Sequence, residues 1–579
     1  MLKALFYVVF ETGSVAVWSG VWGLSFPILD SVRNVAAFPI QYQTAMTTSG
    51  ISPHTLQQLL TGTHELALLD VREARQFVGG HLNLARLAPL STLELEVGER
   101  VPRATTPIVL IDDRDADGPA HRAEALLKRL GYKDVRVLAG GMAAWDAAGL
   151  PRIDGYGSLV KAFGDLVRQH YATPSIRGAD VRARQANAQR THLIDARPRA
   201  EFEFLSLPGA DNYPGTELSL REWSASTPDR LWAINCFSRT RGIIGTTTLR
   251  VLGRKDVAFL EDGVMQWALE RAPVVQNAQV TETLPIASEA TLHSRAAALI
   301  ARYNLSVVQP GDVTRFRAET DRTLYTFDLR PASGSDTAQV PGVRSMAGGQ
   351  LLMHFENLIG TRNARIVLID DSHRLRAAVT AFWLAQLNQA EVFILDGEFP
   401  VDQTYEHGKI ADASNVGDGL TPESVVELLT SRHAQVVDVG PSLDYEHNHL
   451  PGAYFVLPSA LDRLSPLLAT GYPIVFTSPD GIAASLAARD ARERWPDNRF
   501  SWILNGTQAW QAQGLPTEQS WQPSQLLSPF DDDWGSVMRV AGPRRDRAWA
   551  DYLIWERELS ARVIQDPAVQ FKLFEVSDA

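Results

Sequence analysis

The stretch LALLDVREARQFVGGHLNLA at residues 66–85 decides the fold, because its opening pattern returns three more times along the chain. It begins as an apolar run that ends in an aspartate, and a short helix signal precedes each such run. The aspartates lie roughly 110 to 130 residues apart, a period typical of whole domains rather than of solenoid units. They are Asp70, Asp195, Asp328 and Asp438.

Two further apolar strands follow within each repeat, the second as TPIVLID, LWAIN, ARIVLID or YPIVFTS and the third ending near a glycine. Strands that are apolar throughout and alternate with amphipathic helices are typical of a parallel sheet covered by helices on both faces. The sequence therefore predicts an α/β protein of four tandem domains, here called repeats 1 to 4. We expect them at residues 51–153, 175–275, 303–402 and 420–518, between an N-terminal extension at 1–50 and a helical tail at 519–579.

Composition limits the classes of function. A chain of 579 residues with 45% hydrophobic and 21% charged residues is too long for one core and has an ordinary globular composition. Its net charge of −12 and the lack of a long basic run argue against a nucleic-acid partner. A single cysteine cannot form an internal disulfide, which favours a reducing, cytoplasmic location.

The first 45 residues are unusually apolar. The uncharged stretch from Thr12 to Ile28 approaches the length of about 20 residues that spans a membrane. Glu11 interrupts this segment, however, and no clear small-residue cleavage site follows a compact apolar run. A signal peptide or membrane anchor is thus the less favoured alternative, and we predict that Met46 is the true start.

Repeat 1 carries DVREARQFVGGHLNLA and later VLAGGMAAWDAAGLP, and repeat 4 carries HLPGA and ILNGTQAWQAQGLP. These stretches closely resemble the opening and closing signatures of rhodanese-like domains. Repeats 2 and 3 are more diverged but keep DARPRAEF, LEDGVMQW and FDLRP in the same order. The resemblance covers about residues 52–518, and it implies sulfur transfer by a cysteine persulfide without a metal or an organic cofactor.

Cys236 directly follows the strand LWAIN and opens the loop CFSRTRG, 17 residues before Gly253, the spacing of the active cysteine in the resembling family. Backbone N–H groups, the following helix and two arginines are expected to lower the pKa of its thiol. We therefore predict Cys236 as the nucleophile, with a substrate-binding loop made of Phe237, Ser238, Arg239, Thr240, Arg241 and Gly242.

Four residues separate Cys236 from Arg241. Phosphatases and arsenate reductases of this fold use five, which admits a tetrahedral oxyanion, so the shorter loop favours a single sulfur atom. We expect thiosulfate or a similar small donor rather than 3-mercaptopyruvate, because the loop lacks a Cys-Gly pair. The acceptor is expected to be a thiol or cyanide, and a protein thiol could also serve.

The other repeats have no thiol at this position. Counting 17 residues back from the corresponding helix ends predicts Arg114 in repeat 1 and Asp371 in repeat 3, and repeat 4 has TSPDG in this region. These repeats are interpreted as structural, and a non-catalytic scaffold for protein interaction remains the alternative for the whole chain. Structural roles are also expected for Asp195 with Arg197, as an ion pair, and for Asp262, Gly263 and Trp267.

The sequence predicts a helix in the tail from about Arg544, with Trp549, Tyr552 and Leu553 on one face. We expect this face to pack against one of the repeats. A dimerisation arm is the alternative.

Overall fold

The computed structural model describes residues 50–113, 118–223, 230–331, 342–400, 417, 419–431 and 434–575. The predicted N-terminal extension lies outside these ranges except for Gly50, and so does the predicted start at Met46. Among the helices in these ranges, none is both long enough and apolar enough to cross a membrane.

Each repeat contains one sheet with the same strand order. The first strand of the repeat lies at one edge, followed by the fifth, the fourth, the second and the third. All pairings within a repeat are parallel, so the predicted α/β fold is confirmed. The strands are β1 (Gly50–Ile51), β2 (Leu66–Asp70), β3 (Arg86–Leu87), β4 (Ile108–Ile111) and β5 (Val135–Leu138); β6 (Ser175–Ile176), β7 (Thr191–Asp195), β8 (Asp211–Asn212), β9 (Leu231–Asn235) and β10 (Val257–Leu260); β11 (Ser306–Val308), β12 (Leu324–Asp328), β13 (Val343–Ser345), β15 (Arg365–Ile369) and β16 (Glu391–Leu395); β17 (Gly419–Leu420), β18 (Gln435–Asp438), β19 (Tyr454–Phe455), β20 (Ile474–Thr477) and β21 (Phe500–Ile503).

Both faces of these sheets are buried. In β2, Leu66 and Leu68 join one apolar cluster, and the alternate residues Ala67 and Leu69 join another on the opposite face. Successive side chains of a strand point to opposite faces of the sheet, so each sheet has two apolar faces to bury. Helices cover both of them. They are α1 (Pro53–Leu60), α2 (Ala74–Gly79), α3 (Leu93–Arg100), α4 (Pro119–Arg129) and α5 (Gly141–Ala147); α7 (Gly178–Ala186), α8 (Arg199–Phe204), α9 (Thr240–Val251) and α10 (Gly263–Leu269); α12 (Pro310–Ala318), α13 (Gly348–Met353), α14 (Phe355–Leu358) and α15 (Leu375–Leu387); α16 (Pro422–Thr430), α17 (Ser442–His447), α18 (Ser465–Leu468), α19 (Ile482–Arg494) and α20 (Gly506–Ala512).

Repeat 3 also extends the sheet of repeat 1. Its short strand β14 (Thr361–Arg362) pairs antiparallel with β2, with Thr361 opposite Ala67. The Arg362 guanidinium then donates to the carbonyl of Leu60 at 2.8 Å. The repeat pattern in the sequence gave no sign of this pairing, which joins two segments almost 300 residues apart.

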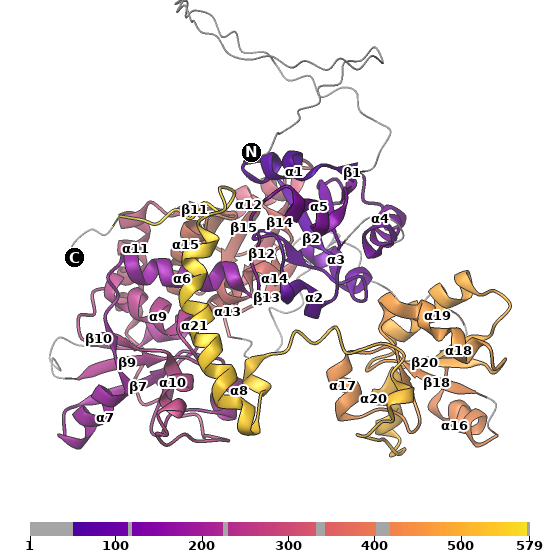
Figure 1. Cartoon of the computed structure of the whole chain (residues 1–579). Helices are drawn as coiled ribbons and strands as arrows, with labels where there is room; N and C mark the ends of the chain where they lie inside the picture. Colours follow the sequence, from indigo (N-terminus) through magenta and orange to yellow (C-terminus); the bar gives the residue numbers. More distant parts are fainter. Residues whose placement is uncertain are drawn as a thin grey trace, which may run out of the picture. The chain divides into compact units, whose positions relative to one another are not determined.

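Among the described residues, three α-helices connect or follow the repeats: α6 (Ser158–His170), α11 (Glu289–Tyr303) and α21 (Arg545–Val563). Helix α21, drawn in yellow, packs along α6 and against α10 (Figure 1). Its Trp549 and Leu553 are buried in the apolar cluster of repeat 2, whereas Leu559 and Val563 join a cluster of repeat 1. The apolar face of the tail is therefore covered by repeats of the same chain.

The aspartate that ends the second strand is buried in every repeat. In repeats 1 to 3 it pairs with an arginine two residues later, as Asp195 does with Arg197 at 2.7 Å, with both side chains fully buried. Asp438 of repeat 4 has Gly440 there instead, and it accepts that residue's backbone N–H at 2.8 Å. Burial without a guanidinium raises the pKa of Asp438 to about 7.

Asp438→Asn should make the stability of repeat 4 less dependent on pH. A carboxyl whose pKa is raised by folding contributes stability that is complete below its unfolded pKa and is lost as the pH rises through about 7. From pH 5 to pH 8 the wild type should lose on the order of 2 kcal/mol more than the variant. Hydrogen exchange of β18 and β20, corrected for intrinsic rates, measures this difference. The exposed Asp497→Asn is the control, and equal losses in wild type and Asp438→Asn would contradict the prediction.

Candidate active site

Cys236 lies between the carboxyl end of β9 and the start of α9, and its side chain is only 2% exposed. The backbone N–H of Gly242 points at its sulfur. Its carbonyl accepts the N–H of Val264 at 3.0 Å, and the carbonyl of Phe237 accepts that of Met265 at 3.0 Å. The amino end of α10 therefore fixes the backbone of the loop that begins at Cys236.

The two arginines of the loop are held differently. Arg241 makes a bidentate ion pair with Glu201 of α8, with N–O distances of 2.6 and 2.7 Å. Arg239 is bound by two carboxylates, Asp165 of α6 at 2.6 Å and Asp262 at 3.2 Å. The charge of Arg241 is the strongest influence that lowers the pKa of Cys236, so Arg241 is the better placed of the two to act on the sulfur.

Burial raises the pKa of the Cys236 thiol above its ordinary value, while the charge of Arg241 and the N–H of Gly242 oppose that rise. The sequence had led us to expect a lowered pKa for this thiol, and this expectation is wrong. The predicted stabilising groups are present, but the desolvation of a fully buried thiolate outweighs them.

A cavity of about 160 Å³ opens over Cys236. The loop contributes Phe237, Ser238, Thr240 and Arg241 to its wall, so the predicted binding residues are brought together there, apart from Arg239 and Gly242. Those two are not in the wall: Arg239 faces its carboxylates, and Gly242 lies against the strand, where a Cβ would come within 3.2 Å of the Ile234 carbonyl.

Most of the remaining wall comes from outside repeat 2. Helix α6 contributes Lys161, the segment joining α13 to α14 contributes His354, and α21 contributes Tyr552 and Glu556. Trp534 and Met538 of the tail complete the apolar side. None of these residues was predicted as a site residue.

Lys161 is the most informative of them. It is half-buried, its Nζ donates to the carbonyl of Tyr156, and it lies over the rings of Tyr552 and Trp555 at 5.6 and 5.3 Å. Burial lowers the pKa of Lys161, whereas the nearby carboxylates of Glu556 and Glu356 favour its charged form. Burial likewise lowers the pKa of His354. The cavity can therefore offer cationic and neutral proton-donating groups to an anion.

The equivalent position in the other repeats can be read from the hydrogen bonds. In each repeat the side chain just after the fourth strand faces an N–H of the next helix: Cys236 that of Gly242, Asp112 that of Ala120, Asp370 that of Ala377, and Ser478 that of Ala484. The counterparts of Cys236 are thus Asp112 and Asp370, not Arg114 and Asp371.

The reason for this correction is loop length. The bonded residues are six positions apart in repeats 2 and 4, seven in repeat 3 and eight in repeat 1. A fixed count of 17 residues therefore fails by one position in repeat 3 and by two in repeat 1. Arg114 itself lies outside the described residues. Carboxylates and a hydroxyl occupy the three positions, and none of these groups can form a persulfide.

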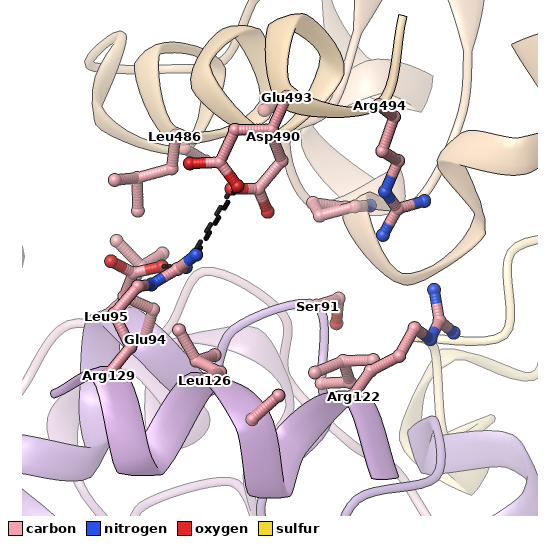
Figure 2. Close-up of a pocket in the computed structure, with 15 residues that line it drawn as sticks. Ser91, Glu94, Leu95, Arg122, Leu126, Arg129, Leu486, Asp490, Glu493 and Arg494 are labelled. Atoms are coloured by element: carbon pink, nitrogen blue, oxygen red, sulfur yellow. Dashed lines mark ion pairs between the residues drawn. The ribbon is translucent and has the colours of Figure 1, made fainter. Parts of the chain in front are cut away.

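A larger cavity, of about 250 Å³, lies between α4 of repeat 1 and α19 of repeat 4 (Figure 2). Arg129 reaches across it toward Asp490 and Glu493, at 4.0 and 3.6 Å, and Arg489 pairs with Glu94 at 2.7 Å. Its wall contains ion pairs and leucines but no nucleophile comparable to Cys236. We therefore place the candidate active site at the smaller cavity.

Repeated α/β domains with a buried thiol at the amino end of a helix are the features expected of a sulfur-transferring protein. Comparisons with known proteins place the chain in the same class. A family model of the rhodanese-like domain matches residues 52–148 and 179–270. A crystal structure of a thiosulfate sulfurtransferase from Pseudomonas aeruginosa is 32% identical, with a TM-score of 0.83, and the match covers 91% of this chain and 99% of that one. The chain belongs to the rhodanese-like sulfurtransferase family.

An uncharacterized protein from Synechocystis sp. is 35% identical over 105 residues, which is 18% of this chain. The match spans 55% of the length of that relative.

Proposed function

We propose that the chain transfers sulfane sulfur from thiosulfate, or a similar small anion, to a thiol or cyanide through a persulfide on Cys236. The observation that carries the proposal is the cavity in which the only cysteine of the chain lies beside Arg241 and Lys161. The 32% identity over nearly the whole length of the Pseudomonas aeruginosa thiosulfate sulfurtransferase supports the same donor.

In the first half-reaction the thiolate of Cys236 attacks the outer sulfur of thiosulfate. An S–S bond forms to Sγ, the S–S bond of the donor breaks, and its electron pair leaves on sulfite. The three negative charges of the reactants are retained, one on the persulfide and two on sulfite. Arg241 and Lys161 would hold the anion, because a buried cation binds oxyanions more strongly than an exposed one.

The thiolate is the form that attacks the donor, and burial works against it by raising the pKa of Cys236. Arg241 and Lys161 must therefore do two things at once. They bind the anionic donor, and their positive charge offsets the cost of desolvating the thiolate. The predicted cytoplasmic location and a protein acceptor stay part of this proposal, and both are compatible with a reactive thiol that must remain reduced.

The experiment that tests the proposal is intact-mass analysis of the purified protein after incubation with thiosulfate. We expect an adduct of one sulfur atom on the wild type and none on Cys236→Ser, and cyanide should remove the adduct as thiocyanate. A wild type that takes up no sulfur from thiosulfate or from other sulfane donors would overturn the proposal and favour the non-catalytic scaffold.

A further inference from the structure

Glu556 is a buried carboxyl group that faces the candidate active site from outside the four repeats. It lies on the inner side of α21, is 2% exposed, and shares the cavity wall with Cys236. Its Oε1 accepts a hydrogen bond from the Thr240 hydroxyl at 3.2 Å, so it is linked to the loop itself. Within the described part of the chain, its Oε2 is buried and has no hydrogen-bond partner.

An unpartnered buried carboxyl oxygen is uncommon and asks for an explanation, because leaving it unsatisfied costs free energy. The Thr240 bond fixes one oxygen of Glu556, and the Ser238 hydroxyl also interacts with the carboxyl, while Oε2 has no hydrogen bond of normal geometry among the described residues and lies in a cavity that must admit a donor or an acceptor. A substrate hydroxyl or thiol is a suitable partner for that oxygen.

The charged groups around Glu556 come from three elements. Lys161 faces it from α6, Arg239 and Cys236 from the active loop, and Tyr552 from its own helix. Burial raises the pKa of Glu556 and lowers that of Lys161, so the two values move toward each other. A carboxyl that is hydrogen-bonded to the active loop and reaches the cavity of Cys236 is placed to accept and return a proton, which is what general acid–base transfer requires.

We propose that Glu556 transfers the proton in the second half-reaction, when a thiol takes the sulfur from Cys236. This inference rests on the proposed persulfide. The carboxylate accepts the proton of the acceptor R–SH, and the acceptor sulfur attacks the outer sulfur of the persulfide. The bond between that sulfur and Sγ breaks, and its electron pair stays on Cys236. The proton passes from Glu556 to the transferred sulfur.

The products are R–S–SH and the Cys236 thiolate. One S–S bond forms and one breaks. One proton and two negative charges, one of them on Glu556, are present before and after the step. Cyanide differs as an acceptor, because its anion attacks the outer sulfur directly and leaves as thiocyanate. That reaction involves no proton transfer, so it does not need Glu556.

The difference between the two acceptors provides the test. Wild type, Glu556→Gln and the exposed control Glu558→Gln on the same helix are loaded with thiosulfate, freed of excess donor, and mixed with 2-mercaptoethanol or cyanide. Loss of the sulfur adduct is followed by mass. For Glu556→Gln we expect discharge to the thiol to slow by about 100-fold near neutral pH and to recover as the pH rises and the acceptor thiol ionises by itself, with discharge to cyanide close to wild type. Glu558→Gln should match wild type with both acceptors.

Equal slowing with both acceptors would overturn the proposal, since it would indicate a structural role, and so would unchanged discharge to the thiol. Glu556→Asp provides a second variant that keeps a titratable group, and it should recover part of the rate to the thiol. Proton transfer would also be contradicted if Glu556→Asp lost all discharge to the thiol while Glu556→Gln discharged to the thiol at the normal rate. If the wild type itself fails to load, the proposed function fails first, and the inference falls with it.

Discussion

Arg241→Ala should slow thiosulfate-dependent loading of Cys236 by at least about 100-fold. Burial raises the pKa of Cys236, and the charge of Arg241 is the strongest of the effects that lower it. Without it, the pKa of the thiol should rise further, less thiolate should form at neutral pH, and the cavity should hold an anionic donor less well. Loading in a single turnover, followed by intact mass from pH 6 to pH 10, measures both the rate and the shift of its pH profile to higher pH.

The control must separate the lost cation from the carboxylate that it leaves behind. Arg241→Ala removes both hydrogen bonds to Glu201, and the uncompensated charge of that group could itself disturb the site. The double variant Arg241→Ala with Glu201→Gln removes this charge and should remain as slow as the single variant. Glu201→Gln alone should load at least as fast as the wild type. Recovery of loading in the double variant would show that the cation is dispensable.

The sequence predicted what depends on local pattern. The four α/β repeats follow from apolar strands and their regular spacing, and Cys236 could be found because a strand, a short polar loop and a helix lie consecutively in the chain. The ion pair of Asp195 and Arg197 was likewise predicted from two neighbouring residues and is present. Such features need no knowledge of how distant segments meet.

The site residues that the sequence analysis missed come from distant segments. Lys161, His354 and Glu556 lie in a linker helix, in repeat 3 and in the tail, and only the packing of α21 along α6 brings them to the loop. One signal was present: Glu556 follows Trp549, Tyr552 and Leu553 on the same helical face, and a glutamate in a buried stripe is unusual. The direction of the Cys236 pKa shift was predicted wrongly for the same reason, because the burial of the thiol cannot be read from the loop sequence alone.

Gly263→Ala should abolish most sulfur loading, although the substitution adds a single methyl group. Gly263 opens α10 with a φ of +56°, a conformation that is costly for residues with a side chain. A Cβ built there would lie 2.3 Å from the carbonyl oxygen of Cys236 and 2.6 Å from that of Ser238. Both contacts are with backbone of the active loop, so no side-chain rotation can relieve them. We expect loading to fall by at least about 100-fold and repeat 2 to lose about 2 to 4 kcal/mol of stability.

Repeat 4 offers a matched control for this steric argument. Gly506 occupies the same place in α20, with a φ of +58° and a Cβ position 1.9 Å from the carbonyl oxygen of Ser478. Gly506→Ala should therefore destabilise repeat 4 to a similar degree while Cys236 still loads at close to the wild-type rate. Hydrogen exchange by repeat, together with sulfur loading by mass, distinguishes the two variants. If Gly263→Ala loaded normally, or if Gly506→Ala lost loading to the same extent, close contact between α10 and the loop would not be what holds Cys236 in its reactive position.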